Sequence, residues 1–355
     1  MNETSRGEQP RVLLAQNLTY PRNQWYVAAG RSEVSRQPLG RKLLGKCVVL
    51  YRTEAGEAVA MDDWCPHRGF RLSQSELIGD SIQCGYHGMR FGPKGNCVHI
   101  PSQDTIPSKM GVTAYPVVER GHLVWIWLGD PGKADAALLP AELEFEDPSY
   151  FSGFVGARTA NCNAAVGLEN VIDITHASLL HPGVLDGASW ELMTARDEVE
   201  TLQPTVIQTT KRFGKMKVAG ELAARNALPQ DTEVIRIRVA RQYLPGLHTS
   251  CETYYDADDE SKVRARRIRY VASTPKDDRS CWLFVAYSGT TQLGPAGLQK
   301  VMETLAQDLA ALESTQAYFD QGDDAFKEVS VRADGAALLA RRIIAKLAVQ
   351  ESTSE

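Results

Sequence analysis

Residues 65–69 read Cys-Pro-His-Arg-Gly and residues 84–88 read Cys-Gly-Tyr-His-Gly, and these two stretches decide how the first part of the chain is interpreted. Each stretch pairs a cysteine with a histidine, as C-x-H in the first and C-x2-H in the second, and sixteen residues separate His67 from Cys84. Four such ligands can hold zinc, or a [2Fe-2S] cluster in which two thiolates bind one iron and two imidazoles the other. Zinc sites more often use C-x2-C pairs, but composition alone leaves both possibilities open.

The segments around both pairs read as short β-strands separated by turns. Residues 47–51 and 58–61 are apolar runs on either side of the turn Glu54-Ala55-Gly56-Glu57, which predicts a hairpin. Similar runs and turns continue as far as Gly129-Asp130-Pro131. We therefore expect a small all-β domain over residues 21–131, after a partly flexible leader of residues 1–20.

The pattern changes after residue 140. Apolar residues at helical spacing predict helices around 166–180, 297–319 and 334–349, with strands through 205–290. An antiparallel sheet with helices would make residues 141–355 a separate catalytic domain, so that the whole chain falls in the α+β class.

Composition excludes several classes of protein. The 355 residues are 43% apolar and 23% charged, with a net charge of -5 and a pI near 5.9, which argues against nucleic-acid binding. No run of eighteen apolar residues and no signal peptide is present, so we expect no membrane span and a cytoplasmic location. Seven scattered cysteines are typical of thiols or metal ligands rather than a disulfide framework.

On these motifs the sequence resembles the Rieske family, and within it the oxygenase branch that contains vanillate demethylase and dicamba monooxygenase. Phe70 and Tyr86 stand where respiratory Rieske proteins carry an additional pair of cysteines. Gly85 and Met89 depart from the common Pro and Trp, but neither is a ligand. The same branch is suggested by residues 25–29, 115–119 and 125–130. The resemblance implies that Cys65, His67, Cys84 and His87 bind a Rieske [2Fe-2S] cluster.

A second site is predicted between residues 169 and 183. Asn170, Asp173 and His176 are three residues apart, which places them along one face of a helix. His181 lies five residues beyond His176, so both imidazoles can reach one metal only if the helix distorts or ends, and Pro182-Gly183 offers that end. Two imidazoles and one carboxylate would form a facial triad with open positions for dioxygen and substrate.

Asp308 is the expected third ligand. It falls within the apolar stripe of the helix predicted at 297–319, where a carboxylate needs a metal or an arginine as partner. Gln307-Asp308, followed by Glu313, resembles the E-D-x4-E segment that carries the third iron ligand in this branch. The resemblance implies that His176, His181 and Asp308 bind a mononuclear Fe(II). The competing carboxylates are Asp320, Asp323 and Asp324.

The resemblance also implies an activity. The chain would be the oxygenase component of a system in which NAD(P)H supplies electrons through a flavin or iron-sulfur reductase, with or without a ferredoxin. With O2 as co-substrate, it would hydroxylate or O-/N-dealkylate a small aromatic compound, favouring an aromatic acid. In the family, electrons pass between neighbouring subunits of a trimer, and Asp173 matches the carboxylate at that junction, unless it only orients His176. Asn170 matches an asparagine close to the iron, or is a helix-surface amide.

Alternatives remain open at this point. A ring dioxygenase that performs cis-dihydroxylation would use the same ligands, and an electron carrier would use only the cluster. Residues 264–269, which include four arginines, could present a cation to a carboxylate or sulfonate, although a solvated strand face is favoured. His248 could contact the substrate, or be an ordinary core or surface histidine.

Overall fold

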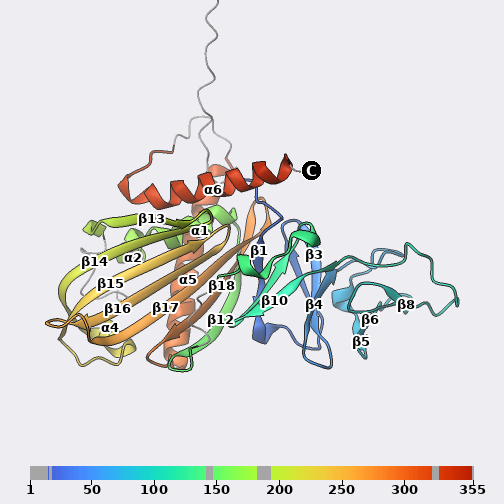
Figure 1. Cartoon of the computed structure of the whole chain (residues 1–355), viewed down its shortest axis with the longest axis horizontal. Coiled ribbons are helices and arrows are strands. Elements are labelled where there is room, and N and C mark those ends of the chain that lie inside the picture. Colours follow the sequence, from blue (N-terminus) through green and yellow to red (C-terminus); the bar gives the residue numbers. More distant parts are fainter. Residues whose placement is uncertain (1–14, 16–17, 141–146, 182–192, 322–327, 354–355) are drawn as a thin grey trace, which may run out of the picture.

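The computed structural model describes residue 15 and residues 18–140, 147–181, 193–321 and 328–353 (Figure 1). Most of the expected leader, together with Pro182-Gly183, Asp323 and Asp324, therefore lies outside the described residues. The chain combines four β-sheets with helices, so the expected α+β class is confirmed. No helix in the described ranges is long and apolar enough to span a membrane.

The largest element is an antiparallel sheet of seven strands in the order β12-β18-β17-β16-β15-β14-β13. Its strands are β12 (Phe151–Ala160), β13 (Asp197–Gln203), β14 (Val206–Val218), β15 (Thr232–Tyr243), β16 (Leu247–Asp256), β17 (Val263–Asp277) and β18 (Ser280–Gly289). The helices are α1 (Ala164–Ile172), α2 (Ala177–Leu180), α4 (Gly220–Arg225), α5 (Pro295–Phe319) and α6 (Gly335–Ser352). Helices α1 and α5 pack on one face of the sheet (Figure 1).

Strand β17 shows how the sheet separates its two faces, because successive side chains of a strand point to opposite sides. Ile268, Tyr270 and Ala272 pack against the N-terminal sheets in one hydrophobic cluster. Arg267 and Arg269 alternate with them and therefore face the helices. The apolar core thus lies on one side of this strand, and charged side chains lie on the other.

The N-terminal part consists of three smaller sheets. A three-stranded sheet has the order β1-β11-β10, and two four-stranded sheets have the orders β2-β3-β4-β9 and β5-β6-β7-β8. Their strands are β1 (Trp25–Gly30), β2 (Leu39–Leu43), β3 (Lys46–Arg52), β4 (Ala58–Asp62), β5 (Glu76–Ile78), β6 (Ser81–Gln83), β7 (Arg90–Phe91), β8 (Cys97–His99), β9 (Ala114–Tyr115), β10 (Val117–Arg120) and β11 (Leu123–Trp127). The expected hairpin around residues 54–57 is confirmed as β3–β4.

The two parts are joined by a buried aromatic contact and by hydrogen bonds. Trp25 and Trp127 stack edge to face and share a cluster with Tyr270 and Phe284 of the large sheet. The Thr274 hydroxyl donates to the Val27 carbonyl at 2.8 Å. Figure 1 shows the small sheet β5–β8 at the far end of the molecule from α1 and α2.

Helix α1, which carries Asn170, is fixed at both of its ends. Asn163 caps its N-terminus by accepting from the Ala165 amide at 2.9 Å. Near its other end, Glu169 forms an ion pair with Arg341 of α6, and Arg341 also pairs with Glu328 at 2.6 Å. Arg341 is buried, so each charge depends on the other for compensation.

We expect Arg341→Ala to lower the free energy of unfolding by about 3 kcal/mol, because the half-buried Glu169 would be left without a counter-charge. The loss should shrink as the pH falls, since the unpaired carboxyl can then take up a proton. Chemical denaturation at two pH values measures both effects. Arg342→Ala removes an exposed arginine one position along and is the matched control; equal losses in the two variants would contradict the assignment.

Candidate active site

The helix predicted around 166–180 is interrupted at the point where the site begins. Helix α1 ends at Ile172, Asp173 is extended, and a short 3-10 turn, Ile174–His176, leads into α2. The Asp173 carboxylate caps this turn by accepting from the Thr175 amide at 2.8 Å. Asn170, Asp173 and His176 therefore do not share one continuous helix face, because capping at Asp173 starts a new turn.

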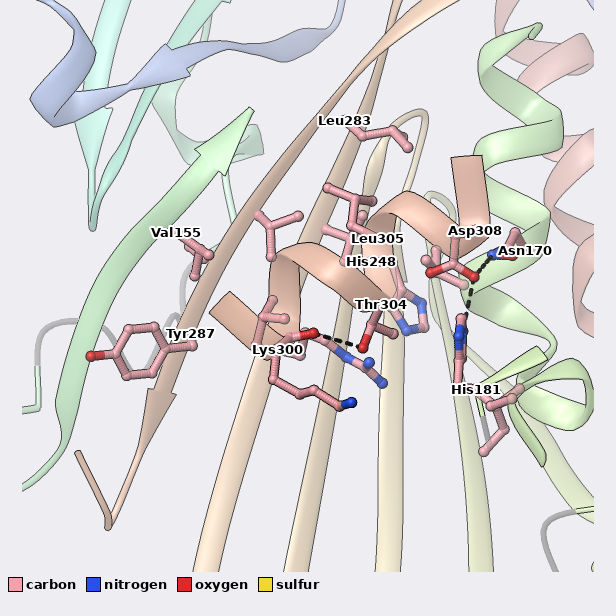
Figure 2. A pocket seen from close by; sticks show the side chains of 18 of the residues that line it. Val155, Asn170, His181, His248, Leu283, Tyr287, Lys300, Thr304, Leu305 and Asp308 are labelled. Carbon is pink, nitrogen blue, oxygen red and sulfur yellow. Dashed lines mark hydrogen bonds and ion pairs between the residues drawn. The ribbon is translucent and has the colours of Figure 1, made fainter. Parts of the chain in front are cut away.

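His176, His181 and Asp308 come together between α1, α2 and α5. Their potential ligand atoms all lie within 4.8 Å of one another. The Asp308 Oδ1 lies 3.4 Å from His176 Nε2 and 3.1 Å from His181 Nε2, and Asn170 Nδ2 donates to the same oxygen at 3.1 Å (Figure 2). Two imidazoles and one carboxylate converging on one point make a donor set suited to a mononuclear iron.

The other nitrogen of each ring is held by an oxygen. His176 Nδ1 lies 2.7 Å from the Asp173 carbonyl, and His181 Nδ1 lies 2.8 Å from Gln307 Oε1. Because both oxygens are acceptors, each Nδ1 donates to its oxygen; each Nε2 donates to Asp308 when the ring is protonated or, in the neutral Nδ1–H form, can bind a metal at the shared point. This is the tautomer that binds a metal, with the kind of outer contact that orients metal-binding histidines.

The electrostatics agree with a cation site. Burial raises the pKa of the Asp308 carboxyl, but the hydrogen bonds from His176 and His181 outweigh it and hold that pKa at about 2. Asp308 is therefore ionised at neutral pH. Of the competing carboxylates, Asp320 pairs with Arg279 at 2.8 Å at the end of α5, so it is engaged elsewhere.

The two cysteine-histidine loops have the same backbone geometry. In each loop the cysteine amide donates to the carbonyl five residues later, at 2.9 and 2.8 Å. The glycine that ends each stretch donates to the cysteine carbonyl at 2.9 Å. Those glycines, Gly69 and Gly88, have φ values of 71° and 74°, which favour glycine. The two loops thus approach one another as equivalent halves of a site.

The two cysteines and two histidines of these loops fit a [2Fe-2S] cluster in which the thiolates bind one iron and the imidazoles bind the other. Cys65 and Cys84 are buried, whereas His67 and His87 are exposed, with ring centroids 4.7 Å apart. Burial raises the pKa of the Cys65 thiol to about 11, an effect that the His67 amide opposes and the adjacent Cys84 thiol reinforces. Amides directed at a cysteine sulfur are the contacts that stabilise a cluster thiolate.

A cavity of about 120 Å³ adjoins the triad (Figure 2). Its apolar walls come from both the sheet and α5, and include Val155, Leu283, Val285 and Leu305. His248 is buried beside it and bonded to Gln242, and burial followed by the nearby Arg238 holds the pKa of His248 well below its ordinary value.

Some lining residues differ from what the sequence suggests. The expected solvated strand face is correct for Arg264, which is exposed and paired with Asp256. Arg267 is half-buried and Arg269 is exposed, and both line the cavity. Strand alternation could have separated these positions only if the register were known. Sequence reasoning assigned no role to Gln307 and did not find Arg225, which also lines the cavity.

Comparison with known proteins agrees with this architecture. Residues 24–116 match the Rieske [2Fe-2S] domain, and residues 160–350 match the vanillate O-demethylase oxygenase C-terminal domain. The chain is 37% identical over 199 residues to a putative toluene-4-sulfonate monooxygenase system iron-sulfur subunit of Comamonas testosteroni, a match that covers 56% of this chain and 54% of that protein. It is 29% identical over 318 residues to a vanillate O-demethylase oxygenase subunit of a Pseudomonas strain, covering 84% and 86%.

Among solved structures, dicamba monooxygenase bound to dicamba superposes with a TM-score of 0.83 at 27% identity, covering 94% of this chain and 98% of that one. The fold and the two sites thus define an iron-sulfur protein of the Rieske oxygenase type. The chain belongs to the family described by the vanillate O-demethylase oxygenase C-terminal domain, joined to an N-terminal Rieske domain. The match spans only about half the length of the first relative.

We expect two substitutions to separate the two metal sites. A cluster and a mononuclear site together predict about three irons per chain. Cys84→Ser should abolish the visible cluster chromophore and leave about one iron, because a thiolate ligand is lost. Asp308→Asn should keep the chromophore but leave about two irons, because the triad loses its anionic ligand. Absorption spectra and iron analysis of the purified variants measure both.

Each of these substitutions has a control in the same part of the fold. Cys97→Ser changes a buried cysteine outside the loops, and Asp320→Asn changes the competing carboxylate on α5. Both should keep about three irons. A full chromophore in Cys84→Ser, or full iron in Asp308→Asn, would overturn the corresponding ligand set.

Proposed function

We propose that the chain is the oxygenase component of a multicomponent Rieske system, and that it hydroxylates or O-/N-dealkylates a small aromatic acid. The observation that carries the proposal is the His176, His181 and Asp308 triad opening onto a cavity with apolar walls. An electron carrier would leave this triad and its cavity without a task. The vanillate and dicamba O-demethylase relatives favour dealkylation or hydroxylation over ring dihydroxylation.

Within this function the chain's own residues have distinct tasks. An Fe(II) held by the triad would supply open positions for dioxygen, and the cluster would supply electrons one at a time. Gln307 and the Asp173 carbonyl keep the two imidazoles turned toward the metal position. The aliphatic walls exclude water and fit an aromatic ring. Asn170, through its hydrogen bond to Asp308, fixes the carboxylate rather than remaining a free surface amide.

Electron delivery requires partners. We propose a flavin or iron-sulfur reductase, with or without a ferredoxin, as the NAD(P)H-dependent donor, and a homotrimer in which the cluster of one chain serves the triad of the next. Support comes from the separation of β5–β8 from α1 and α2 in Figure 1. None of the seven cysteines forms a disulfide, which fits a reducing, cytoplasmic location.

We expect oxygen-dependent turnover when the protein is combined with a reductase, NADH and methoxy-, methyl- or unsubstituted aromatic acids. Formaldehyde release or a gain of one oxygen, measured by product mass, is the predicted result. A gain of two oxygens and two hydrogens would identify a dioxygenase instead. If iron-loaded protein turned over none of the aromatic acids or neutral arenes, that result would contradict the proposal.

Asp173→Asn is expected to keep both metals and slow electron transfer between them. Asparagine caps a helical turn as well as aspartate does, so the fold around Thr175 is preserved while the charge is lost. Single-turnover cluster oxidation, followed by rapid-mixing spectroscopy, measures the rate. A rate equal to that of the parent protein would exclude Asp173 from the electron path and leave only its capping role.

A further inference from the structure

Three arginines gather at the cavity. Arg225 of α4 and Arg267 and Arg269 of β17 line it, and none of them forms an ion pair or a hydrogen bond with another described residue. The Nε of Arg225 is buried without an acceptor. Arg225 and Arg267 are half-buried, whereas Arg269 is exposed, and all three line the cavity. Guanidinium groups that gather at a partly enclosed cavity repel one another unless a counter-charge lies among them, so this cluster would be stabilised by an anion.

The sheet register explains why these charges gather. Lys211, Arg238, Glu252 and Arg267 are neighbours on four adjacent strands and form one row on the face toward the helices. Other contacts already engage the first part of this row. Lys211 pairs with Asp197 at 3.1 Å, and Arg238 donates to the Ser250 hydroxyl at 2.8 Å.

Glu252 is the acidic residue of this row, and its carboxylate already has two other partners. It pairs with Arg236 at 2.9 Å and accepts from the Tyr254 hydroxyl at 3.0 Å. Burial raises the pKa of Glu252, but Arg236, Arg267, Arg269 and Arg225 together bring it below its usual range. One carboxylate thus faces four guanidinium groups. The charged residues that line the cavity, Arg225, Arg267, Arg269 and Lys300 against Glu221 and Asp308, leave it with excess positive charge.

Burial and the excess positive charge lower the pKa values of two of these arginines. Burial, followed by repulsion from Arg267, lowers the pKa of Arg225 to about 9. Burial also lowers the pKa of Arg269, on which Asp308 of the triad acts in the opposite direction. Arg269 is therefore close enough to the triad to interact with Asp308, whereas Arg225 is repelled by Arg267. An anion in the cavity would offset the repulsion.

We propose that Arg225, Arg267 and Arg269 form an oxyanion subsite that binds the carboxylate or sulfonate of an aromatic acid. The proposal rests on the proposed function for its view of the cavity as the substrate pocket. The planar forks of the arginines suit the oxygens of either group. With the acid group held there, the ring lies between the aliphatic walls and its far substituent points to the triad. The subsite thereby selects both the charge and the orientation of the substrate.

The first test compares acids with neutral analogues of the same shape. Benzoate and benzenesulfonate are titrated into the anaerobic, iron-loaded protein by calorimetry, beside benzamide and benzenesulfonamide. We expect each acid to bind about tenfold or more tightly than its amide, because charge-assisted hydrogen bonds are lost in the amide. The tighter of the two acids identifies carboxylate or sulfonate as the natural group. Acids that bind no better than the amides, or do not bind, overturn the proposal.

The second test uses Arg225→Gln and Arg267→Gln. Each should weaken binding of the preferred acid about tenfold and abolish its stabilising shift of Tm, while Arg225→Lys recovers part of the affinity. Without ligand, their Tm should equal or exceed that of the parent, because a repulsive charge is removed. A merely structural arginine would instead lower it. Arg264→Gln, on the same strand but exposed and paired with Asp256, is the matched control and should change none of these values.

The outcomes also separate this inference from the proposed function. Acid binding that depends on Arg225 and Arg267, without turnover of any aromatic, would support the subsite and contradict the oxygenase assignment. Turnover of neutral arenes with no preference for acids would support the oxygenase assignment and contradict the subsite. A lowered ligand-free Tm in both glutamine variants, or equal weakening in Arg264→Gln, would assign the arginines to the fold and reject the subsite.

Discussion

The contact between His181 and Asp308 is the constraint on which the catalytic part depends. It joins residues that are 127 positions apart, at 3.1 Å, and it brings an ionised carboxylate into a largely buried place. Such a carboxylate is stable only with donors on several sides, and these come from α1, from the turn before α2 and from a second imidazole. The break at Asp173 follows from this need, because a continuous helix would place the two imidazoles on different faces.

The face of the large sheet that is turned toward the helices carries more charged side chains than is usual in a structural core. Apolar packing on the face toward the helices lies where α1, α5 and α6 cover the sheet, whereas the cavity beside it is lined by the guanidinium groups of Arg225, Arg267 and Arg269. Buried ion pairs contribute little net stability compared with apolar packing, so this arrangement is explained by binding rather than by folding. The helices fixed around the site, including α1 through Glu169 and Arg341, provide the rigidity that the charged face does not.

The sequence predicted those parts of both sites that depend on local spacing. The C-x-H and C-x2-H pairs sit in tight loops, and Asp308 lies on a long regular helix, so short-range geometry was sufficient for each. The interruption at Asp173 was missed because a side-chain cap competes with helix propagation, and the helical period carries no sign of it. Arg267 and Arg269 could not be separated from Arg264 and Arg266, because the buried face of β17 is set by strand register and by the helices that cover it.

The two ends of the molecule differ in how they can be reached. The imidazoles of His67 and His87 are exposed beside Tyr86, which is 60% accessible, whereas His181 is only 4% accessible. An electron donor can therefore approach the cluster directly, while the triad must be reached through the protein surface at Asp173 or through the cavity. One chain holds these two environments apart, so it excludes water from the substrate without closing the cluster to its donor. This separation of the two sites within one chain is the feature that supports the proposed homotrimer, in which the cluster of one chain would serve the triad of the next.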